Sequence, residues 1–168
     1  GCKMHHQLQN LLENKVLYVR INRTENTYHE FVKICEAIKI DINQKSIIEI
    51  GSGWLPIFPY FLLYLGQVSA VFSFDLNKHY QKKRIANFNS IFSKNYNATI
   101  DPLPLSKYNL PAGVHYCPGV KIINSEIPDA DIVVSRFVLE HVTPDDIFEM
   151  HQKLRNSLKK GTRIVHFI

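Results

Sequence analysis

A glycine-containing bend follows a strand-like run and has a carboxylate beside it. Residues 47–50 are apolar apart from Glu49, and Gly51 and Gly53 then stand two positions apart. Glycines at such a bend give the backbone torsional freedom and let a ligand approach the main chain closely. The next strand-like run ends in Asp75, about 20 residues beyond the bend, where a carboxylate can accept the hydroxyls of a ribose. A lone Gly-x-Gly can be a simple tight turn, but its pairing with Asp75 favours a nucleoside site.

Two details of the bend bear on which nucleoside ligand it would hold. A dinucleotide places its pyrophosphate over a helix N-terminus, and a third glycine normally packs that helix closely on the strand. Leu55 and Pro56 occupy this region here. Glu49 would repel a pyrophosphate, whereas it would suit a cationic group such as the ammonium of a methionine moiety. Both details argue against NAD and favour a nucleoside that carries a positive charge.

A second group of chemically able side chains follows another strand-like run, in the stretch from Ser135 to His141. His141 could act as a general base toward a hydroxyl acceptor, because the ordinary pKa of histidine lies near neutral pH. The alternative is that Glu140 and His141 tie this loop to neighbouring helices. No HxxxH or HExxH spacing occurs among the eight histidines, so no metal site is expected.

Strands alternate with helices from residue 46 onward, and this alternation predicts the fold. Strands are expected at 46–50, 70–74, 119–123, 131–135 and 163–168. Helices are expected at 57–66, at 79–93, and from Pro144 towards Gly161, with Thr143 as the cap of the last helix. Such alternation predicts an α/β fold, a doubly wound and mainly parallel sheet with helices on both faces.

The chain is expected to be a single domain with a helical extension at its N-terminal end. Residues 1–45 form the predicted extension, in which Thr27 to Glu30 has the form of a capping box at a helix start. Residues 46–168 form the predicted core. Residues 94–113 contain three prolines and read as a long loop of the kind that is often functional or mobile.

The composition is that of an ordinary globular protein, with 45% hydrophobic and 21% charged residues. No stretch approaches the roughly 20 apolar residues of a membrane helix, and no secretory signal is visible. Three cysteines form neither a metal-like spacing nor an even disulfide set, which favours a cytoplasmic, reducing location. The net charge of +5 could favour an anionic partner, but solvated helix faces are the better explanation of the two basic clusters.

Residues 46–168 resemble a known family, the class I S-adenosylmethionine-dependent methyltransferases. Four stretches carry the resemblance in the right order across residues 46–168: IIEIGSGW, VFSFDLN, PDADIVVSRFVLEHV and LRNSLKKGTRIVHFI. The resemblance implies a Rossmann-like core that binds S-adenosylmethionine and releases S-adenosylhomocysteine. It implies cofactor contacts from residues at the ends of three strands. At the end of the first strand these are Glu49, Gly51, Ser52, Gly53 and Trp54. At the end of the second they are Asp75 at the ribose, Leu76 at the adenine and Asn77, and at the end of the expected strand 131–135 they are Ser135, Arg136 and Phe137.

Three departures from the family pattern accompany these matches. The third glycine of the bend is lost. No acidic residue closes the expected strand 119–123 to hold the adenine amino group, for which Asn124, Ser125 or Glu126 are substitutes. The chain also stops after the expected fifth strand, where the family usually continues. We therefore expect either a fragment of a longer protein or a sheet completed in some other way, in which a homodimer could cover the exposed edge strand.

The sequence thus predicts methyl transfer from S-adenosylmethionine to a small-molecule acceptor that it does not identify. The expected reaction is an in-line displacement that depends mostly on positioning, with His141 as the candidate base. One alternative is a non-catalytic module of the same fold that binds the cofactor or a protein partner. An NAD-dependent oxidoreductase is disfavoured by Glu49 and the missing glycine. Nucleic-acid modification rests only on the positive charge.

Overall fold

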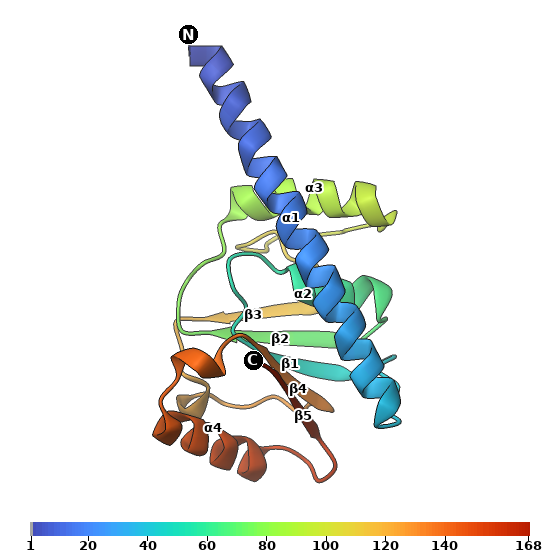
Figure 1. The fold of residues 1–168 in the computed structure, drawn as a ribbon, viewed down its shortest axis with the longest axis vertical. Coiled ribbons are helices and arrows are strands. Elements are labelled where there is room, and N and C mark those ends of the chain that lie inside the picture. The colour runs from blue at the N-terminus through green and yellow to red at the C-terminus, as the bar shows by residue number, and fades with distance from the viewer. Residues whose placement is uncertain (1) are drawn as a thin grey trace. The chain divides into compact units, whose positions relative to one another are not determined.

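A computed structural model describes residues 2–168, with side chains from residue 14 onward (Figure 1). The chain divides into two compact units, and the boundary along the sequence lies between Ile40 and Asp41. The first unit contains one long helix, α1 (Cys2–Ala37). The capping box predicted at Thr27 is wrong, because α1 runs through it without a break. Thr27 Oγ1 instead donates a hydrogen bond to the carbonyl oxygen of Arg23, one turn earlier, at 3.2 Å.

The second unit alternates strands and helices, as the sequence predicts. Its strands are β1 (Ser46–Ile50), β2 (Ala70–Asp75), β3 (Val114–Pro118), β4 (Ile132–Arg136) and β5 (Arg163–Phe167). Its longer helices are α3 (Lys82–Tyr96) and α4 (Pro144–Ser157). Shorter helical segments are α2 (Ile57–Tyr60), which continues as the π-helix η1 (Phe61–Leu65), and the 3₁₀ turns η2 (Ile122–Asn124) and η3 (Leu139–His141).

The five strands form one parallel sheet in the order β3-β2-β1-β4-β5. The chain builds outward from β1 through β2 to β3 and then returns to the other side of β1 for β4. This reversal of direction lies between β1 and β4, and in open parallel sheets ligands bind beyond the carboxyl ends of the strands at such a point. The structure confirms the doubly wound α/β fold that the alternation predicts.

Helices cover both faces of this sheet (Figure 1). On one face, aromatic rings of α2 and α3 pack together, with Tyr60 and Phe88 at 4.9 Å between ring centroids. On the other face, Met150 and Leu154 of α4 pack against Ile48 and Ile50 of β1 in a buried cluster. Because both faces are covered, β1 and β4 are almost continuous apolar runs rather than alternating ones.

The third strand lies earlier in the chain than the sequence suggested. The expected strand at 119–123 is wrong, because β3 ends at Pro118 and Gly119 turns the chain at a φ of +73°. The amide of Gly119 donates to the carbonyl oxygen of Asp75, which caps the β2–β3 pairing. The apolar Ile122 belongs to the turn η2 and is buried in the α4-side core, so its hydrophobicity reflects packing and not strand pairing.

The start of α4 confirms the predicted capping signals. Thr143 Oγ1 accepts a hydrogen bond from the amide of Asp146 at 3.3 Å, and Pro144 takes the first helical position. Asp145 and Asp146 place negative charge at the positive end of the helix dipole. This capped first turn stands beside the carboxyl ends of the strands and therefore forms part of the site described next.

Candidate functional site

The bend after β1 needs its two glycines for different reasons. Gly51 has a φ of +83° and Gly53 a φ of +64°, a left-handed region that other residues rarely occupy. At Gly51 a Cβ atom would also overlap with Cγ2 of Val138, whereas at Gly53 it would meet nothing. The amide of Gly51 donates to the carbonyl oxygen of Phe74 at 2.8 Å. The bend is therefore packed tightly against the loop after β4 on one side and open on the other.

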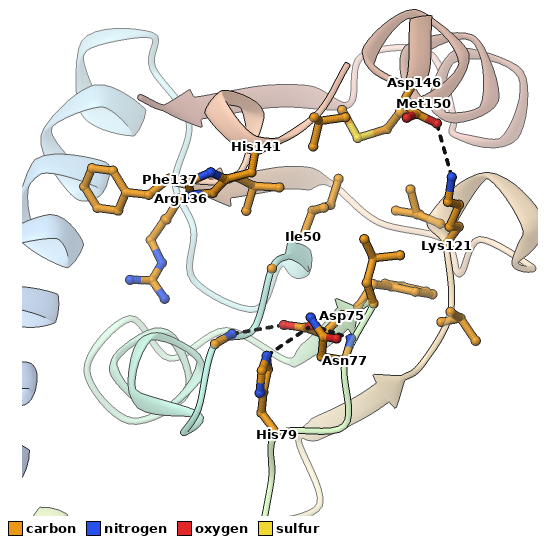
Figure 2. Close-up of a pocket in the computed structure, with 18 of the residues that line it drawn as sticks. Ile50, Asp75, Asn77, His79, Lys121, Arg136, Phe137, His141, Asp146 and Met150 are labelled. Atoms are coloured by element: carbon orange, nitrogen blue, oxygen red, sulfur yellow. Dashed lines mark hydrogen bonds and ion pairs between the residues drawn. The ribbon is translucent and has the colours of Figure 1, made fainter. Parts of the chain in front are cut away.

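Asp75 links this bend to the end of β2. Its Oδ2 accepts hydrogen bonds from the Gly53 amide at 3.2 Å and the Ser52 hydroxyl at 3.1 Å. Its Oδ1 accepts from the Asn77 amide at 2.8 Å, and His79 Nε2 lies 3.8 Å away. Because backbone donors hold both oxygens, the carboxylate has a fixed orientation (Figure 2). It is thus positioned to accept ligand hydroxyls without reorganising.

Glu49 lies elsewhere than the sequence suggested. Its side chain is fully buried beneath the bend and does not line the cavity, because it pairs with Arg136 Nη2 at 3.1 Å and accepts from the Ser73 hydroxyl at 2.7 Å. Burial raises the pKa of Glu49, while the charge of Arg136 and the Ser73 hydrogen bond oppose that rise. The Phe58 ring lies 4.4 Å from the guanidinium carbon. Of this ion pair, Arg136 lines the cavity and Glu49 does not.

A cavity of about 520 Å³ opens beyond the carboxyl ends of β1, β2 and β4 (Figure 2). Eight of the residues predicted to bind the cofactor line this cavity, together with His141: Gly51, Gly53, Trp54, Asp75, Leu76, Asn77, Arg136 and Phe137. Glu49, Ser52 and Ser135 do not line it. Sequence reasoning missed a further group of lining residues, Val120 to Ile123, Val138, Val142, Asp146 and Met150. Volumes of this order are typical of small-molecule sites.

The rim of the cavity carries large apolar side chains that face solvent. Trp54 is 52% exposed and Leu76 is 59% exposed, although both are of types that normally bury most of their surface. The Trp54 ring packs against the His79 ring at a tilt of 36°, with 4.5 Å between ring centroids. Phe137 is 52% exposed, and its ring points away from the centre of the cavity (Figure 2). The rim thus offers apolar surface that a flat ligand could cover.

The segment after β3 forms the opposite wall. Val120, Lys121, Ile122 and Ile123 line the cavity there, and Lys121 Nζ pairs with Asp146 of α4 at 3.3 Å. Asn124, Ser125 and Glu126, expected as substitutes for an adenine-binding acid, instead line a second, open hollow together with Cys117. The wall of the first cavity is therefore mainly aliphatic on this side.

Ser135 belongs to a hydrogen-bonded chain that the sequence did not reveal. Its hydroxyl is fully buried and lies 2.6 Å from His166 Nδ1 on β5. His166 Nε2 lies 3.1 Å from His151 Nε2, and His151 Nδ1 lies 2.8 Å from the carbonyl oxygen of Ile147. Because a carbonyl only accepts, His151 Nδ1 carries the proton; in the neutral chain His166 Nε2 then donates to His151 and Ser135 donates to His166. Burial and then the neighbouring His151 lower the pKa of His166.

His141 stands at the edge of the cavity, on the turn η3. Its ring is 76% exposed, and its Nε2 lies 3.4 Å from a carboxylate oxygen of Glu140. The pair is therefore accessible to an acceptor molecule and is not bound into the core, so the base hypothesis stays a prediction.

Within the described part of the chain, no cluster of three or more metal-ligating side chains occurs, and no helix has the length and apolar character needed to cross a bilayer. Cys35 and Cys117 are free thiols, while Cys2 lies outside the residues whose side chains are described.

The comparisons with known proteins concern the fold. No protein-family model matches the sequence, and no curated protein matches it. Solved structures do match this chain. The glycopeptide N-methyltransferase MtfA matches at 11% identity over 85% of this chain and 52% of the MtfA chain, with a TM-score of 0.54. The same enzyme complexed with sinefungin matches at 11% identity over 83% of this chain and 51% of its own, with a TM-score of 0.53.

A third match is the pyocyanin biosynthetic protein PhzM, at 13% identity over 83% of this chain and 34% of its own, with a TM-score of 0.54. The chain therefore spans about half or less of the length of the structures it matches. At such identities the likeness concerns the fold alone. With the sheet order and the site at its switch point, it shows that residues from β1 to β5 have the Rossmann-like fold of the class I S-adenosylmethionine-dependent methyltransferases.

Proposed function

We propose that this chain binds S-adenosylmethionine in the 520 Å³ cavity and transfers its methyl group to a small-molecule acceptor. The observation that carries the proposal is the fixed Asp75 carboxylate beside the Gly51–Gly53 bend, at the switch point of a methyltransferase-type sheet. The methyltransferase MtfA, which shares this fold, has been crystallised with sinefungin.

The lining suggests how the nucleoside part would be held. Asp75 would accept the ribose hydroxyls, because its oxygens are already oriented by backbone amides. The adenine would lie between Leu76 and the aliphatic wall of Val120, Ile122 and Ile123, which would shield its faces from water. Asp146 lines the cavity near this wall but is already paired with Lys121, so base recognition would rest on shape and on the backbone.

The remaining part of the cavity would hold the methionine moiety and the acceptor. The bend at Gly51 and Gly53 permits close approach to the main chain there. When bound, S-adenosylmethionine supplies an electrophilic methyl group, so the protein needs mainly to align an acceptor with it and to exclude water. The exposed Trp54 would cover part of an acceptor, and His141 would accept the proton of a hydroxyl acceptor.

Binding of S-adenosylhomocysteine and of NAD, measured separately by calorimetry and thermal stability, tests the proposal. We expect S-adenosylhomocysteine to bind and to raise the melting temperature, and NAD to do neither. Asp75→Ala should weaken the binding of S-adenosylhomocysteine by about 1–3 kcal/mol, because charge-assisted hydrogen bonds to the ribose are lost. Asp129→Ala is the matched control, because Asp129 is an exposed carboxylate that does not line the cavity. Binding of NAD in place of S-adenosylhomocysteine would overturn the proposal.

Methyl transfer needs a separate measurement, because a binding module would pass the first test. Incubation with methyl-labelled S-adenosylmethionine and a pool of small molecules should give labelled product and S-adenosylhomocysteine. His141→Asn should then lower turnover of a hydroxyl acceptor without changing cofactor affinity. Tight cofactor binding with no turnover in any pool would favour the non-catalytic alternative.

A further inference from the structure

The hydroxyl of Tyr116 ties β3 to the segment that follows β2. It accepts a hydrogen bond from the His79 amide at 2.9 Å and donates one to the carbonyl oxygen of Asn77 at 3.1 Å. One oxygen atom thus bonds two backbone groups that stand two residues apart in the chain. Because both bonds are made to the main chain, the hydroxyl fixes the path of residues 76–79, which come directly after Asp75.

This 76–79 segment carries the groups that surround one oxygen of the Asp75 carboxylate (Figure 2). The Asn77 amide donates to Asp75 Oδ1 at 2.8 Å, and His79 Nε2 lies 3.8 Å from the same oxygen. The His79 ring also packs against Trp54 at the rim of the cavity. Asp75, Asn77 and His79 line the cavity, whereas Tyr116 does not. Any influence of Tyr116 on a bound ligand must therefore pass through the 76–79 segment.

The ring and the hydroxyl of Tyr116 have separable roles. The ring stacks on Tyr80, with 3.7 Å between centroids, and lies edge-on to Tyr108 at 5.2 Å. A phenyl ring at the same position keeps both contacts. The main chain of Asp75 is held independently, because the Gly119 amide donates to its carbonyl oxygen at 2.8 Å. Loss of the hydroxyl therefore leaves the pairing of β2 with β3 in place and releases only the 76–79 segment.

We propose that Tyr116 is a positioning residue, whose hydroxyl holds the 76–79 segment so that Asp75 presents its carboxylate to a ribose. The proposal rests on the proposed function, which assigns the ribose hydroxyls to Asp75. A carboxylate that is already oriented loses little freedom when a ligand binds, so its orientation raises affinity. The strand β3 thus contributes to the nucleoside site through a side chain that lies outside the cavity.

Tyr116→Phe tests this role, because it removes the hydroxyl and keeps the ring. Calorimetry compares S-adenosylhomocysteine with its 2′,3′-dideoxyribose analogue, which lacks the hydroxyls that Asp75 would accept. The variant should bind S-adenosylhomocysteine about three- to tenfold more weakly, the range for one hydrogen bond. It should bind the dideoxy compound as well as the unmodified protein does. A merely structural role of Tyr116 would instead weaken both compounds by the same factor.

Tyr108→Phe is the matched control for the calorimetry. It removes a hydroxyl from the same aromatic group, and its ring lies edge-on to that of Tyr116 and outside the cavity lining. Its affinities for both compounds should equal those of the unmodified protein.

Amide hydrogen exchange of the ligand-free protein, followed by NMR, tests the positioning without a ligand. In Tyr116→Phe the His79 amide loses its acceptor and should exchange faster. The Asn77 amide donates to Asp75 and not to Tyr116, so it should exchange faster only if the hydroxyl holds the segment in place. The Gly51 amide, which donates to the Phe74 carbonyl oxygen at 2.8 Å, is the internal reference. Unchanged exchange at Asn77 would show that Asp75 keeps its orientation without Tyr116, which overturns the proposal.

The binding results decide in the same way. A loss of affinity for S-adenosylhomocysteine that disappears with the dideoxy compound supports the positioning role. Equal losses for both compounds, or no loss for either, overturn it. If the dideoxy compound binds too weakly to compare, exchange at Asn77 decides. If S-adenosylhomocysteine does not bind the unmodified protein, the proposed function fails, and exchange at Asn77 alone decides whether Tyr116 orients Asp75.

Discussion

Substitution of Gly51 by alanine gives the sharpest test of how the bend is held. The residue combines a φ of +83° with a Cβ position that overlaps Cγ2 of Val138. Gly53 shares the positive φ, at +64°, but its Cβ position is open. The two glycines therefore separate backbone strain from steric overlap within a single loop.

The expected magnitudes follow from these two terms. A left-handed conformation costs a non-glycine residue roughly 1–2 kcal/mol, and overpacking typically costs about 1–3 kcal/mol. Gly53→Ala should therefore lower the free energy of unfolding by about 1 kcal/mol, from strain alone. Gly51→Ala should lower it by about 3 kcal/mol, because both terms act.

Urea unfolding followed by far-UV circular dichroism measures both variants, and Val138→Ala completes a double-mutant cycle. The overlap disappears when Val138 is shortened, so Gly51→Ala should be less damaging in the Val138→Ala background by about 1–2 kcal/mol. No such coupling is expected between Gly53→Ala and Val138→Ala. Equal destabilisation by the two glycine variants, with no coupling to Val138, would refute the steric account of the bend.

Three further predictions concern the groups that hold the core together. Because the pKa of His166 is lowered in the folded protein, its contribution to stability should be fully present above pH 6.5 and be lost as the pH falls below it, by up to about 1.4 kcal/mol per pH unit. In His166→Gln, the difference in the free energy of unfolding between about pH 7.5 and about pH 5.5, measured by urea unfolding, should be smaller. Tyr60→Phe should cost about 1–2 kcal/mol in the same assay, because buried Asn89 Oδ1 loses its donor at 2.7 Å; an unchanged midpoint would contradict this. Asp131→Ala should cost about 1 kcal/mol by freeing the Ser46 amide, and should speed its hydrogen exchange.

The fold was largely predictable because its signals are local. Runs such as residues 46–50 and 132–136 contain enough β-branched apolar residues to predict buried strands, and the alternation with helices then predicts a parallel sheet. The cap of α4 was equally readable, since Thr143 and Pro144 act within one turn of the chain. Signals of this kind need no knowledge of distant residues.

The errors arose where distant contacts decide the structure. Val114 to Pro118 contains His115, Tyr116 and Cys117, a weak strand pattern that becomes a strand only because β2 offers a free edge for it. The Thr27 capping box failed because the residues before it are themselves helical, so Thr27 has no free amides to cap. In both cases the local pattern was compatible with two structures.

The candidate site shows the same division. Asp75 and the glycines were predictable, because the carboxyl ends of neighbouring parallel strands share one edge of the sheet. The burial of Glu49 against Arg136 was not, because the two residues lie 87 positions apart in sequence. The chain from Ser135 through His166 to His151 joins β4, β5 and α4, and only the assembled fold brings these residues together.

The place of β1 in the sheet has a consequence for how the chain folds. One edge of β1 pairs with β2, which follows soon after it, but the other edge pairs with β4, as Ile47 does with Ile132. Closing so long a loop carries a large entropic penalty before any contact repays it. A growing chain would therefore expose one side of β1 on the ribosome until the segment around residue 132 emerges. We therefore expect slow refolding.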